Sequence, residues 1–476
     1  MPDQSPLVAP APGPDLSRPR RVHIVGIGGA GMSAIATVLL AMGHTVSGSD
    51  AADSGRLRRL AQEGAQVRVG HDPAWLGGAD LVVVSTAIPP TNVEAAEAVR
   101  RGLRVWRRAE ALAAICAERR TIAIAGTHGK TSTSAMLAVI LHAAGWRPSY
   151  IIGSEITGLG PGAAWQPDGE WLVVEADESD GTFLMLGAEA VLVTSVEPDH
   201  VEFYGSMGAL DDAFHRFVAA APGPRVLCAD DAGAAALAAA GASPDTAVLT
   251  YGTAERATVR IEGVTLGRAG CAFSIVVGGH SQGPVQVGAP GLHNVRNAAG
   301  ALTMAASLGV SWESAIPALV HYQGVARRAE HRGERDGVVW IDDYGHLPGE
   351  VAPMLAAVAA GGWRRVVAVF QPHRFSRTEA LWRDFRDAFT AADVLLVTDI
   401  YPAGEPPRPG ISGQLIVDAV HAAHPGADVR YVPTLDAAAA ALGQILQPGD
   451  VCVTLGAGDL TTLPDRFLAR PGADHA

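Results

Sequence analysis

Residues 125–131 carry the types and spacing that could bind a phosphate. They follow an apolar run, residues 121–125, that predicts a buried strand, and precede residues 132–141, which are typical of a helix. A strand, a glycine-bearing turn and a helix N-terminus together offer backbone N–H groups and the positive end of the helix dipole to an anion. Lys130 could reach the terminal phosphates of a nucleotide, and the Thr131 hydroxyl could bind Mg²⁺.

The spacing of this loop differs from the general P-loop, because Gly126 stands two positions closer to the lysine than that pattern requires. A second observation supports phosphate binding. Lys130 is the only lysine in the chain, which otherwise uses arginine as its cation. Since arginine does not replace the compact charge of an ammonium group, a retained lysine indicates a specific role here.

A second glycine-rich turn lies near the N-terminus. Gly26, Gly28 and Gly31 match G-x-G-x-x-G between an expected strand at 21–25 and a helix that runs to about residue 42. Asp50 ends the next strand, near the place of a ribose-binding acid. The pattern predicts a bound pyrophosphate without naming the nucleotide. A tight turn that binds nothing is the alternative.

Acidic residues follow the expected strand at 171–175. Four carboxylates lie between Glu175 and Asp180, at the end of the strand where ligands bind in open α/β sheets, and Glu175 is the expected metal ligand. A solvated acidic turn is the alternative. The apolar run that begins at Ala190 leads to Asp199 and His200, and His200 is a candidate ligand for a second cation or a phosphate.

Later motifs add amides and arginines. Asn294 and Asn297 are three residues apart and share a helix face, where they could recognise adenine or its ribose, although helix capping by Asn294 explains the first equally well. One arginine of the pair at 327–328 could reach the γ-phosphate, although paired arginines are also typical of a solvated face. His373, Arg374 and Arg377 could clamp a carboxylate, with a solvated basic turn as the alternative.

Composition sets the broad class. The 476 residues predict about three domains, and the net charge of −13 argues against a nucleic-acid partner. The four cysteines are widely spaced, which favours a reducing cytoplasm, and no apolar run is long enough for a membrane span. We expect an α/β protein with a disordered tail at 1–18, a Rossmann-like domain at 19–107, a central P-loop ATPase-like parallel sheet at 108–323 and a doubly wound C-terminal domain at 324–476.

Taken in order, these motifs resemble those of the Mur ligases, in particular the branch that adds alanine. The resemblance covers nearly the whole chain, from about residue 22 to residue 458. It rests on residues 26–33, 126–131, 177–180, 199–200, 293–297, 324–328, 342–346, 370–378 and 401–405.

The resemblance implies an ATP-dependent ligase that phosphorylates the lactyl carboxylate of UDP-N-acetylmuramate and joins L-alanine to it. It implies that Lys130, His200 and Arg328 are catalytic and that Thr131, Glu175 and His200 bind Mg²⁺. Around ATP it places Gly126, Thr127, His128, Gly129, Lys130, Thr131, Ser132, Asn294, Asn297, Arg328 and Asp343. Around the UDP-sugar it places Gly28, Gly29, Ala30, Gly31, Met32, Ser33, His71, Ser85 and Thr86, to which Asp50 is added from the strand pattern. Around the amino acid it places Tyr344, His346, His373, Arg374 and Arg377.

Other functions remain open at this point. A near relative that recycles tripeptides onto the same nucleotide is less favoured, because it carries Tyr where this chain has Ser179. A nicotinamide-dependent oxidoreductase would leave the phosphate loop without a role, and a nucleotide-binding regulator would bind ATP without turnover. The chain departs from the family pattern at Ser195, Leu347 and Gly349. We expect small-molecule partners only, no nucleic acid or membrane, and a monomer or weak homodimer.

Overall fold

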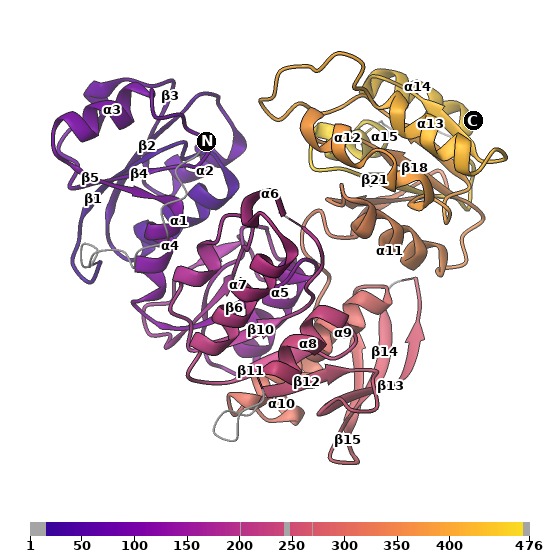
Figure 1. The fold of residues 1–476 in the computed structure, drawn as a ribbon, viewed down its shortest axis with the longest axis horizontal. Helices are drawn as coiled ribbons and strands as arrows, with labels where there is room; N and C mark the ends of the chain where they lie inside the picture. Colours follow the sequence, from indigo (N-terminus) through magenta and orange to yellow (C-terminus); the bar gives the residue numbers. More distant parts are fainter. Residues whose placement is uncertain (1–15, 200, 242–247, 269, 470–476) are drawn as a thin grey trace. The chain divides into compact units, whose positions relative to one another are not determined.

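The computed structural model describes residues 16–199, 201–241, 248–268 and 270–469. These form two compact units (Figure 1). One contains Met1–Glu262, Ser274–Val285 and Arg296–His321, and the other contains Gly263–Phe273, Gln286–Val295 and Tyr322–Ala476. Leu16, within the predicted tail, is buried, and residues 1–15 lie outside the described part. None of the helices in the described ranges is both long and apolar enough to cross a membrane.

The first sheet has the strand order β3-β2-β1-β4-β5 within the described residues, and its strands pair in parallel. Its central strands are apolar and buried, as expected for a parallel sheet covered on both faces. The order reverses at β1, so the turn after β1 lies at the switch point where such sheets bind ligands. The elements are β1 (Arg21–Val25), α1 (Ala30–Ala41), β2 (Thr45–Asp50), α2 (Gly55–Gln62), β3 (Gln66–Val69), η1 (Pro73–Leu76), β4 (Leu81–Val84), α3 (Val93–Arg100), β5 (Arg104–Arg107) and α4 (Arg108–Cys116).

The second sheet carries the phosphate loop, and its order is β15-β14-β13-β12-β11-β10-β6-β9-β7-β8 in the part of the chain that the structure describes. β6 lies between β9 and β10, and both pairings are parallel, whereas β8 pairs antiparallel with β7. The predicted strand before the loop is confirmed as β6, and the predicted helix after it as α5.

The first elements of this region are β6 (Arg120–Ala125), α5 (Lys130–Ala143), β7 (Ser149–Ile151), β8 (Ala163–Ala164), β9 (Trp171–Glu175), η2 (Thr182–Met185), β10 (Ala190–Val193), α6 (Val201–Tyr204) and α7 (Met207–Ala220). They are followed by β11 (Arg225–Cys228), α8 (Ala232–Ala240), β12 (Val248–Gly252), β13 (Val259–Leu266), β14 (Cys271–Val277), β15 (His280–Val287), α9 (Leu292–Ser307), α10 (Trp312–Ala318) and η3 (Leu319–His321).

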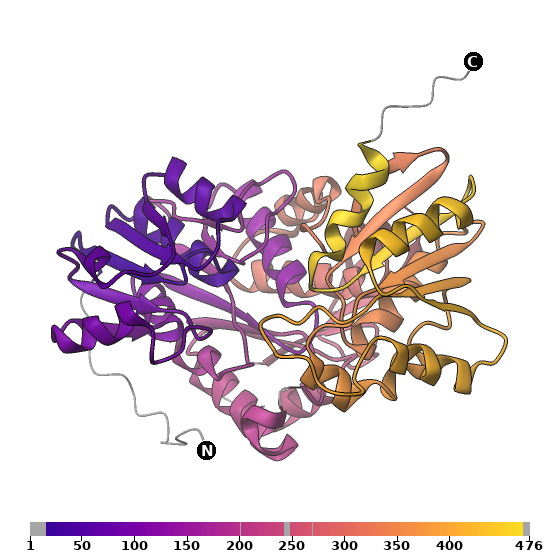
Figure 2. The same cartoon turned by 90° about the horizontal axis from the view of Figure 1, so that it is seen from above.

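The third sheet has the order β16-β17-β21-β18-β19-β20 within the described residues and is parallel except for β16. Figure 2 draws this part of the chain in orange to yellow. The four strands predicted here are confirmed as β17, β18, β19 and β21. The elements are β16 (Glu330–Arg335), β17 (Val338–Asp343), α11 (Pro348–Ala359), β18 (Val366–Phe370), α12 (Phe375–Leu381), η4 (Asp384–Asp387), β19 (Val394–Val397), α13 (Gln414–Ala423), β20 (Asp428–Tyr431), α14 (Leu435–Ile445), β21 (Val451–Leu455), η5 (Asp459–Thr462) and α15 (Leu463–Leu468).

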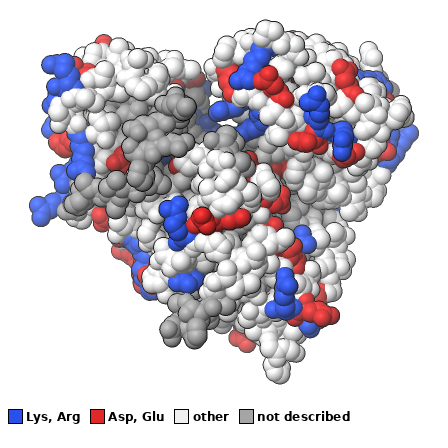
Figure 3. All heavy atoms as spheres, viewed as in Figure 1, with Lys and Arg blue, Asp and Glu red and all other residues white. Residues whose placement is uncertain are grey.

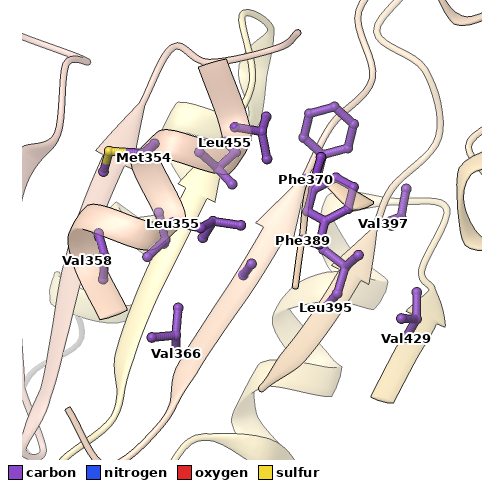
Figure 4. Packing of buried hydrophobic residues seen from close by; sticks show 14 of the residues in the cluster. Met354, Leu355, Val358, Val366, Phe370, Phe389, Leu395, Val397, Val429 and Leu455 are labelled. Atoms are coloured by element: carbon purple, nitrogen blue, oxygen red, sulfur yellow. The ribbon is translucent and has the colours of Figure 1, made fainter. Parts of the chain in front are cut away.

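This sheet is covered on both faces. Val366 and Phe370 of β18 pack with Leu355 of α11 and Leu395 of β19 on one face (Figure 4). Val367, which points to the opposite face because side chains alternate along a strand, packs with residues of α14. Helices on both faces confirm the doubly wound architecture predicted for this domain, and the ligand edge lies at the carboxyl ends of its parallel strands.

Candidate active site

The phosphate loop between β6 and α5 accepts only glycine at two positions. Gly126 and Gly129 have φ angles of +130° and +81°, in the region that L side chains rarely adopt. A Cβ at Gly126 would lie 2.2 Å from Oγ1 of Thr194, and one at Gly129 would lie 2.5 Å from Oδ1 of Asn297. The backbone of the loop therefore packs directly on the chain after β10 and on α9.

Ser195 holds the loop in place. Its carbonyl oxygen accepts the N–H of Thr127 at 3.0 Å, and its hydroxyl accepts the N–H of His128 at 2.9 Å. Ser195, one of the positions where the chain departs from the family pattern, thus contacts the phosphate loop directly. α5 begins directly afterwards, and the first N–H groups of any helix have no acceptor within it, which suits them to phosphate oxygens.

Lys130 is partly buried in the site, with 14% of its side chain exposed, and already has hydrogen-bond acceptors around it. Its Nζ donates to the Gly126 carbonyl at 2.6 Å and to Oε1 of Glu178 at 2.9 Å. Burial alone would lower the pKa of Lys130, but the carboxylates of Glu178 and Asp177 outweigh burial and raise that pKa. The lysine is therefore charged at neutral pH. Glu178 is only 2% exposed, so the alternative of a solvated acidic turn is wrong for this residue.

The donors predicted for Mg²⁺ fit a hard cation. Oγ1 of Thr131, at the start of α5, donates to Oε1 of Glu175, at the end of β9, at a distance of 3.1 Å. Both are oxygen ligands, and Mg²⁺ commonly binds through one or two protein groups while it keeps several waters. The third predicted ligand, His200, lies outside the described residues. Among those that are described, no cluster of three or more His, Cys, Asp or Glu side chains could hold a metal ion.

α9 carries both predicted asparagines, and both are buried. Asn294 is the third residue of this helix and not the residue that precedes it, so the capping alternative is wrong. Its Nδ2 donates to the Pro290 carbonyl at 2.7 Å. Asn297 lies against Gly129 of the phosphate loop, which places one amide of this helix directly beside the expected nucleotide site.

Asp343 ends β17 and is held by the backbone. Its carboxylate accepts the N–H groups of Ala329 at 2.8 Å and Gly345 at 2.7 Å. Burial raises the pKa of Asp343 to about 6, although these hydrogen bonds and the nearby Arg328 oppose the shift. The side chain is therefore a preformed acceptor at the ligand edge of the third sheet.

The two adjacent arginines both lie over the Tyr344 ring, Arg327 at 4.7 Å from its centre, but their other contacts differ. Arg327 donates to the carbonyl oxygens of Gly456 and Gly458, at 2.6 and 3.2 Å, which ties it to the backbone after β21. The guanidinium of Arg328 lies 5.3 Å from the centre of the Tyr344 ring. The solvated-face alternative is wrong for both residues, since neither is exposed.

Four of the five predicted amino-acid residues contact one another in the third domain, whereas Arg374 is exposed. The rings of Tyr344, His346 and His373 contact in succession at 5.6 Å between centres, and Nη1 of Arg377 donates to Nδ1 of His373 at 3.3 Å. Burial and the neighbouring positive groups lower the pKa of His373 to about 4, so its ring is neutral and accepts this hydrogen bond. Arg374 precedes α12 with a φ of +71°, a strained backbone of the kind often found at functional sites.

One member of this ring cluster was missed as a site residue. Tyr401 stacks on His373 at 5.7 Å with an angle of 10° between the rings. The motif at 401–405 was recognised, but the stacking depends on the loop after β19 lying beside the loop after β18, which spacing in the sequence does not reveal.

Two of the predicted residues, Asp50 and Ser85, contact the glycine turn after β1. The N–H of Gly28 donates to Oδ2 of Asp50 at 2.9 Å. A Cβ at Gly26 would lie 2.9 Å from that of Ser85, so the loop after β4 packs on the turn. Residues 30–33, including Met32, form the first turn of α1, with Gly29 preceding it. Thr86 is exposed beside Ser85.

His71 contacts groups that the sequence did not single out. Its Nδ1 lies 3.1 Å from Oγ of Ser49 and 3.0 Å from Oε2 of Glu94. Glu94 and nearby His23 are both buried. Glu94 follows Asn92 at a helix start, where an acid needs no further explanation, so the sequence carried no signal for this cluster.

Family models match the chain in three consecutive segments. Residues 21–120 match the Mur ligase family catalytic domain, residues 124–305 the Mur ligase middle domain and residues 327–458 the Mur ligase glutamate ligase domain. Together these segments cover most of the sequence in the order found in the fold.

Similar proteins carry related names. A protein of Solidesulfovibrio magneticus named UDP-N-acetylmuramate–L-alanine ligase is 45% identical over 94% of this chain and 98% of its own length. The crystal structure of a UDP-N-acetylmuramate-alanine ligase from Thermotoga maritima is 26% identical, with a TM-score of 0.82 over 95% of this chain and 99% of that one.

A murein peptide ligase from Psychrobacter arcticus is also similar in structure, at 25% identity, with a TM-score of 0.70 over 96% of this chain and 100% of that one. The curated relatives favour the alanine-adding type over the tripeptide-recycling and oxidoreductase alternatives. The three family models match consecutive segments of one chain, and the chain folds around three sheets. The chain therefore belongs to the Mur ligase family.

Proposed function

We propose that this chain joins L-alanine to the lactyl carboxylate of UDP-N-acetylmuramate with the conversion of ATP to ADP and phosphate, the first peptide step of peptidoglycan precursor synthesis. The observation that carries the proposal is the phosphate loop, in which the chain's only lysine donates to the loop backbone and to Glu178. The 45% identity to a protein of that name supports the choice of substrates.

The reaction needs activation because a carboxylate is a poor acyl donor at neutral pH. A carboxylate oxygen of the sugar attacks the γ-phosphorus of ATP, and ADP leaves. The alanine amine then attacks the carbonyl carbon of the acyl phosphate, the carbon–oxygen bond breaks, and phosphate and a proton are released. Positioning and charge neutralisation supply most of the catalysis in phosphoryl transfer.

We assign the central residues to the nucleotide. The loop backbone and Lys130 are assigned to the phosphates, with Asn297 beside the loop. Asn294, Arg328 and Asp343 are also assigned to ATP. Mg²⁺, held by Thr131 and Glu175 with His200, would neutralise charge on the phosphates.

We assign the first domain to the UDP-sugar and the third domain to the amino acid. The glycine turn, Asp50, His71, Ser85 and Thr86 bind the UDP-sugar. Tyr344, His346, His373 and Arg374 line the amino-acid site, where Arg377 binds the carboxylate of alanine in the bidentate geometry that arginine favours. We also infer a cytoplasmic location, supported by the four free cysteines, each of them buried, and a monomer or weak homodimer.

The experiment measures ADP release with each substrate omitted in turn. ADP should appear only when UDP-N-acetylmuramate, L-alanine and ATP are all present. With ¹⁸O in the lactyl carboxylate, one labelled oxygen should be found in the released phosphate. Unlabelled phosphate would rule out the acyl phosphate, and faster turnover with a tripeptide than with alanine would favour the recycling activity.

A further inference from the structure

A buried group of polar side chains lies in the first domain, behind the proposed UDP-sugar site. Glu94 is 0% exposed and His23 is 1% exposed, and Ser49 is also fully buried. His71 reaches this group from the loop after β3 with 20% of its side chain exposed. Burying a carboxylate is costly unless its oxygens are hydrogen-bonded, so a fully buried acid beside a substrate site requires an explanation.

The fold delivers these residues from three elements. Glu94 lies in the first turn of α3, where Asn92 caps its N–H at 2.9 Å and the helix dipole favours an acid. His23 of β1 pairs in register with Ser47 of β2. Because side chains alternate along a strand, Ser49 points to the same face as Ser47.

The contacts of Glu94 converge on its two oxygens. The hydroxyl of Ser49 donates to Oε2, Nδ1 of His71 lies 3.0 Å from the same oxygen, and Nε2 of His23 lies 3.6 Å from Oε1. Burial alone would raise the pKa of Glu94, but its interactions with His23, Ser49 and His71 outweigh burial and lower that pKa. Glu94 is therefore an ionised carboxylate at neutral pH.

An ionised carboxylate only accepts hydrogen bonds, so Nδ1 of His71 must carry the proton between them. The same nitrogen also lies 3.1 Å from Oγ of Ser49. Because the Ser49 hydroxyl already donates its proton to Glu94, its oxygen can only accept a hydrogen bond from His71. Both contacts therefore select the same protonation of the ring. A carboxylate that sets the tautomer and orientation of a histidine is a recurring arrangement at functional sites.

The same network reaches the glycine turn. The carbonyl oxygen of Ser49 accepts the N–H groups of Gly26 at 2.8 Å and Ile27 at 3.0 Å. Ser49 thus holds the glycine turn with its backbone and Glu94 with its side chain. The position of His71 and the shape of the turn are coupled through one residue.

We propose that Glu94 is a positioning residue of the UDP-sugar site, which fixes the ring of His71 with its proton on Nδ1 and leaves Nε2 for the substrate. The inference rests on the proposed function in that the UDP-sugar is the ligand of His71. Glu94 itself acts through His71 and does not touch the substrate.

The first test needs no variant. In wild-type protein labelled with ¹⁵N-histidine, the His71 signals, assigned by comparison with His71→Gln, should show a protonated Nδ1 at neutral pH. A His71 ring protonated on Nε2 alone would overturn the proposal, whether or not the protein turns over a UDP-sugar.

The second test is Glu94→Gln, which keeps the shape of the side chain but adds an amide donor and removes the charge. We expect the KM for UDP-N-acetylmuramate to rise about tenfold or more, while kcat and the KM values for ATP and alanine change by less than about twofold. The matched control is Glu97→Gln on the same helix, whose carboxylate pairs with Arg100 and Arg101. An unchanged KM for the UDP-sugar in a folded Glu94→Gln protein would refute the role.

A double-mutant cycle separates positioning from general destabilisation. If Glu94 acts through His71, Glu94→Gln should add little to the KM effect of His71→Ala, since residues that act as a unit are not additive. Fully additive effects would contradict the proposal. If wild-type protein neither binds nor converts the UDP-sugar, the proposed function fails, and the ring protonation of His71 still decides whether Glu94 orients it.

Discussion

Lys130 shows how much of the site depends on one side chain. Its ammonium group donates to the Gly126 carbonyl at 2.6 Å and to the Glu178 carboxylate at 2.9 Å, a geometry that a planar guanidinium does not reproduce. We expect Lys130→Arg to lower kcat about a thousandfold or more, because the charge is retained but not its position. ADP release measures the effect, and an unchanged thermal unfolding midpoint shows that the fold is intact. Near-normal turnover would exclude a role for Lys130 at the γ-phosphate.

Arg377 tests the amino-acid site in the same way. Its guanidinium donates to His373 in a cluster of rings, and the proposed function assigns it to the carboxylate of alanine. Arg377→Ala should raise the KM for alanine roughly tenfold or more and the KM for ATP much less, since only one substrate loses a charged partner. Exposed Arg383, which lies over Trp382, offers Arg383→Ala as a control. An equal effect of Arg377→Ala on both KM values would contradict a carboxylate clamp.

His373 makes the stability of the third domain depend on pH. Its pKa of about 4 in the folded protein lies below the ordinary value of 6.5, because of burial and neighbouring positive groups. As pH falls from about 6.5 to about 4, the unfolded chain binds a proton that the folded chain resists, so the free energy of unfolding drops by on the order of 2 kcal/mol.

His373→Gln should remove this part of the pH dependence. The measurement is the unfolding midpoint of both proteins at about pH 7.5 and about pH 5. The wild type should lose more stability than the variant between these two values. A larger loss in the variant would show that the sign is wrong.

At the scale of elements, the phosphate loop depends on backbone that only glycine can supply. We expect Gly126→Ala to destabilise the protein by about 3 kcal/mol and to abolish ATP binding, because the methyl group would overlap Thr194 as well as strain the backbone. Gly145→Ala is the matched control, since Gly145 has a φ of +80° but nothing within 4 Å of a Cβ. It should cost about 1 kcal/mol and leave ATP binding intact.

Unfolding in denaturant and calorimetric titration with ATP measure the two effects. Equal losses of stability in Gly126→Ala and Gly145→Ala would mean that the close packing around the loop contributes nothing. Retained ATP binding in Gly126→Ala would place the nucleotide elsewhere.

Strands that are continuous apolar runs were predictable from the sequence, and a strand without apolar residues was not. The apolar runs of β6, β9 and β18 are each bounded by glycine or polar residues, so their type and position followed from the sequence. β16, with the sequence EHRGER, has no apolar pattern, and its edge position is stabilised by antiparallel pairing with β17. The sequence of a strand alone does not reveal the strand with which it pairs.

At the scale of the whole molecule, the reactivity of the cysteine thiols distinguishes the folded from the unfolded protein. Cys116, Cys228, Cys271 and Cys452 are all free and buried. Burial raises the pKa of Cys116 to about 12 and that of Cys271 to about 11, which leaves almost no reactive thiolate at neutral pH. A thiol reagent should therefore modify the native protein very slowly, without loss of activity, and should modify all four thiols in denaturant.

Counting modified thiols by absorbance or mass tests this expectation in each state. Rapid reaction of one thiol in the native protein, with loss of ADP release, would indicate a reactive cysteine that the structure does not provide. Fewer than four reactive thiols after unfolding under non-reducing conditions would indicate a disulfide.

Charges of both signs lie on the face of the molecule that is drawn in Figure 3. On the face drawn in Figure 3, basic and acidic side chains lie interspersed among uncharged residues. The cations assigned to anionic substrates are instead local, as with Lys130 in its loop.

The sequence by itself determined the family, the α/β class and the residues at the carboxyl ends of the strands, because glycine turns and apolar runs are local signals. The domain boundaries near residues 107 and 323, and the chemical roles of the site residues, stay predictions. Only the tertiary structure decided which neighbours those residues have. It showed that Lys130 donates to Glu178, that Tyr401 stacks on His373 and that His71 hydrogen-bonds to Glu94. These contacts join positions far apart in the chain, and they form because parallel strands bring distant loops to one edge of a sheet.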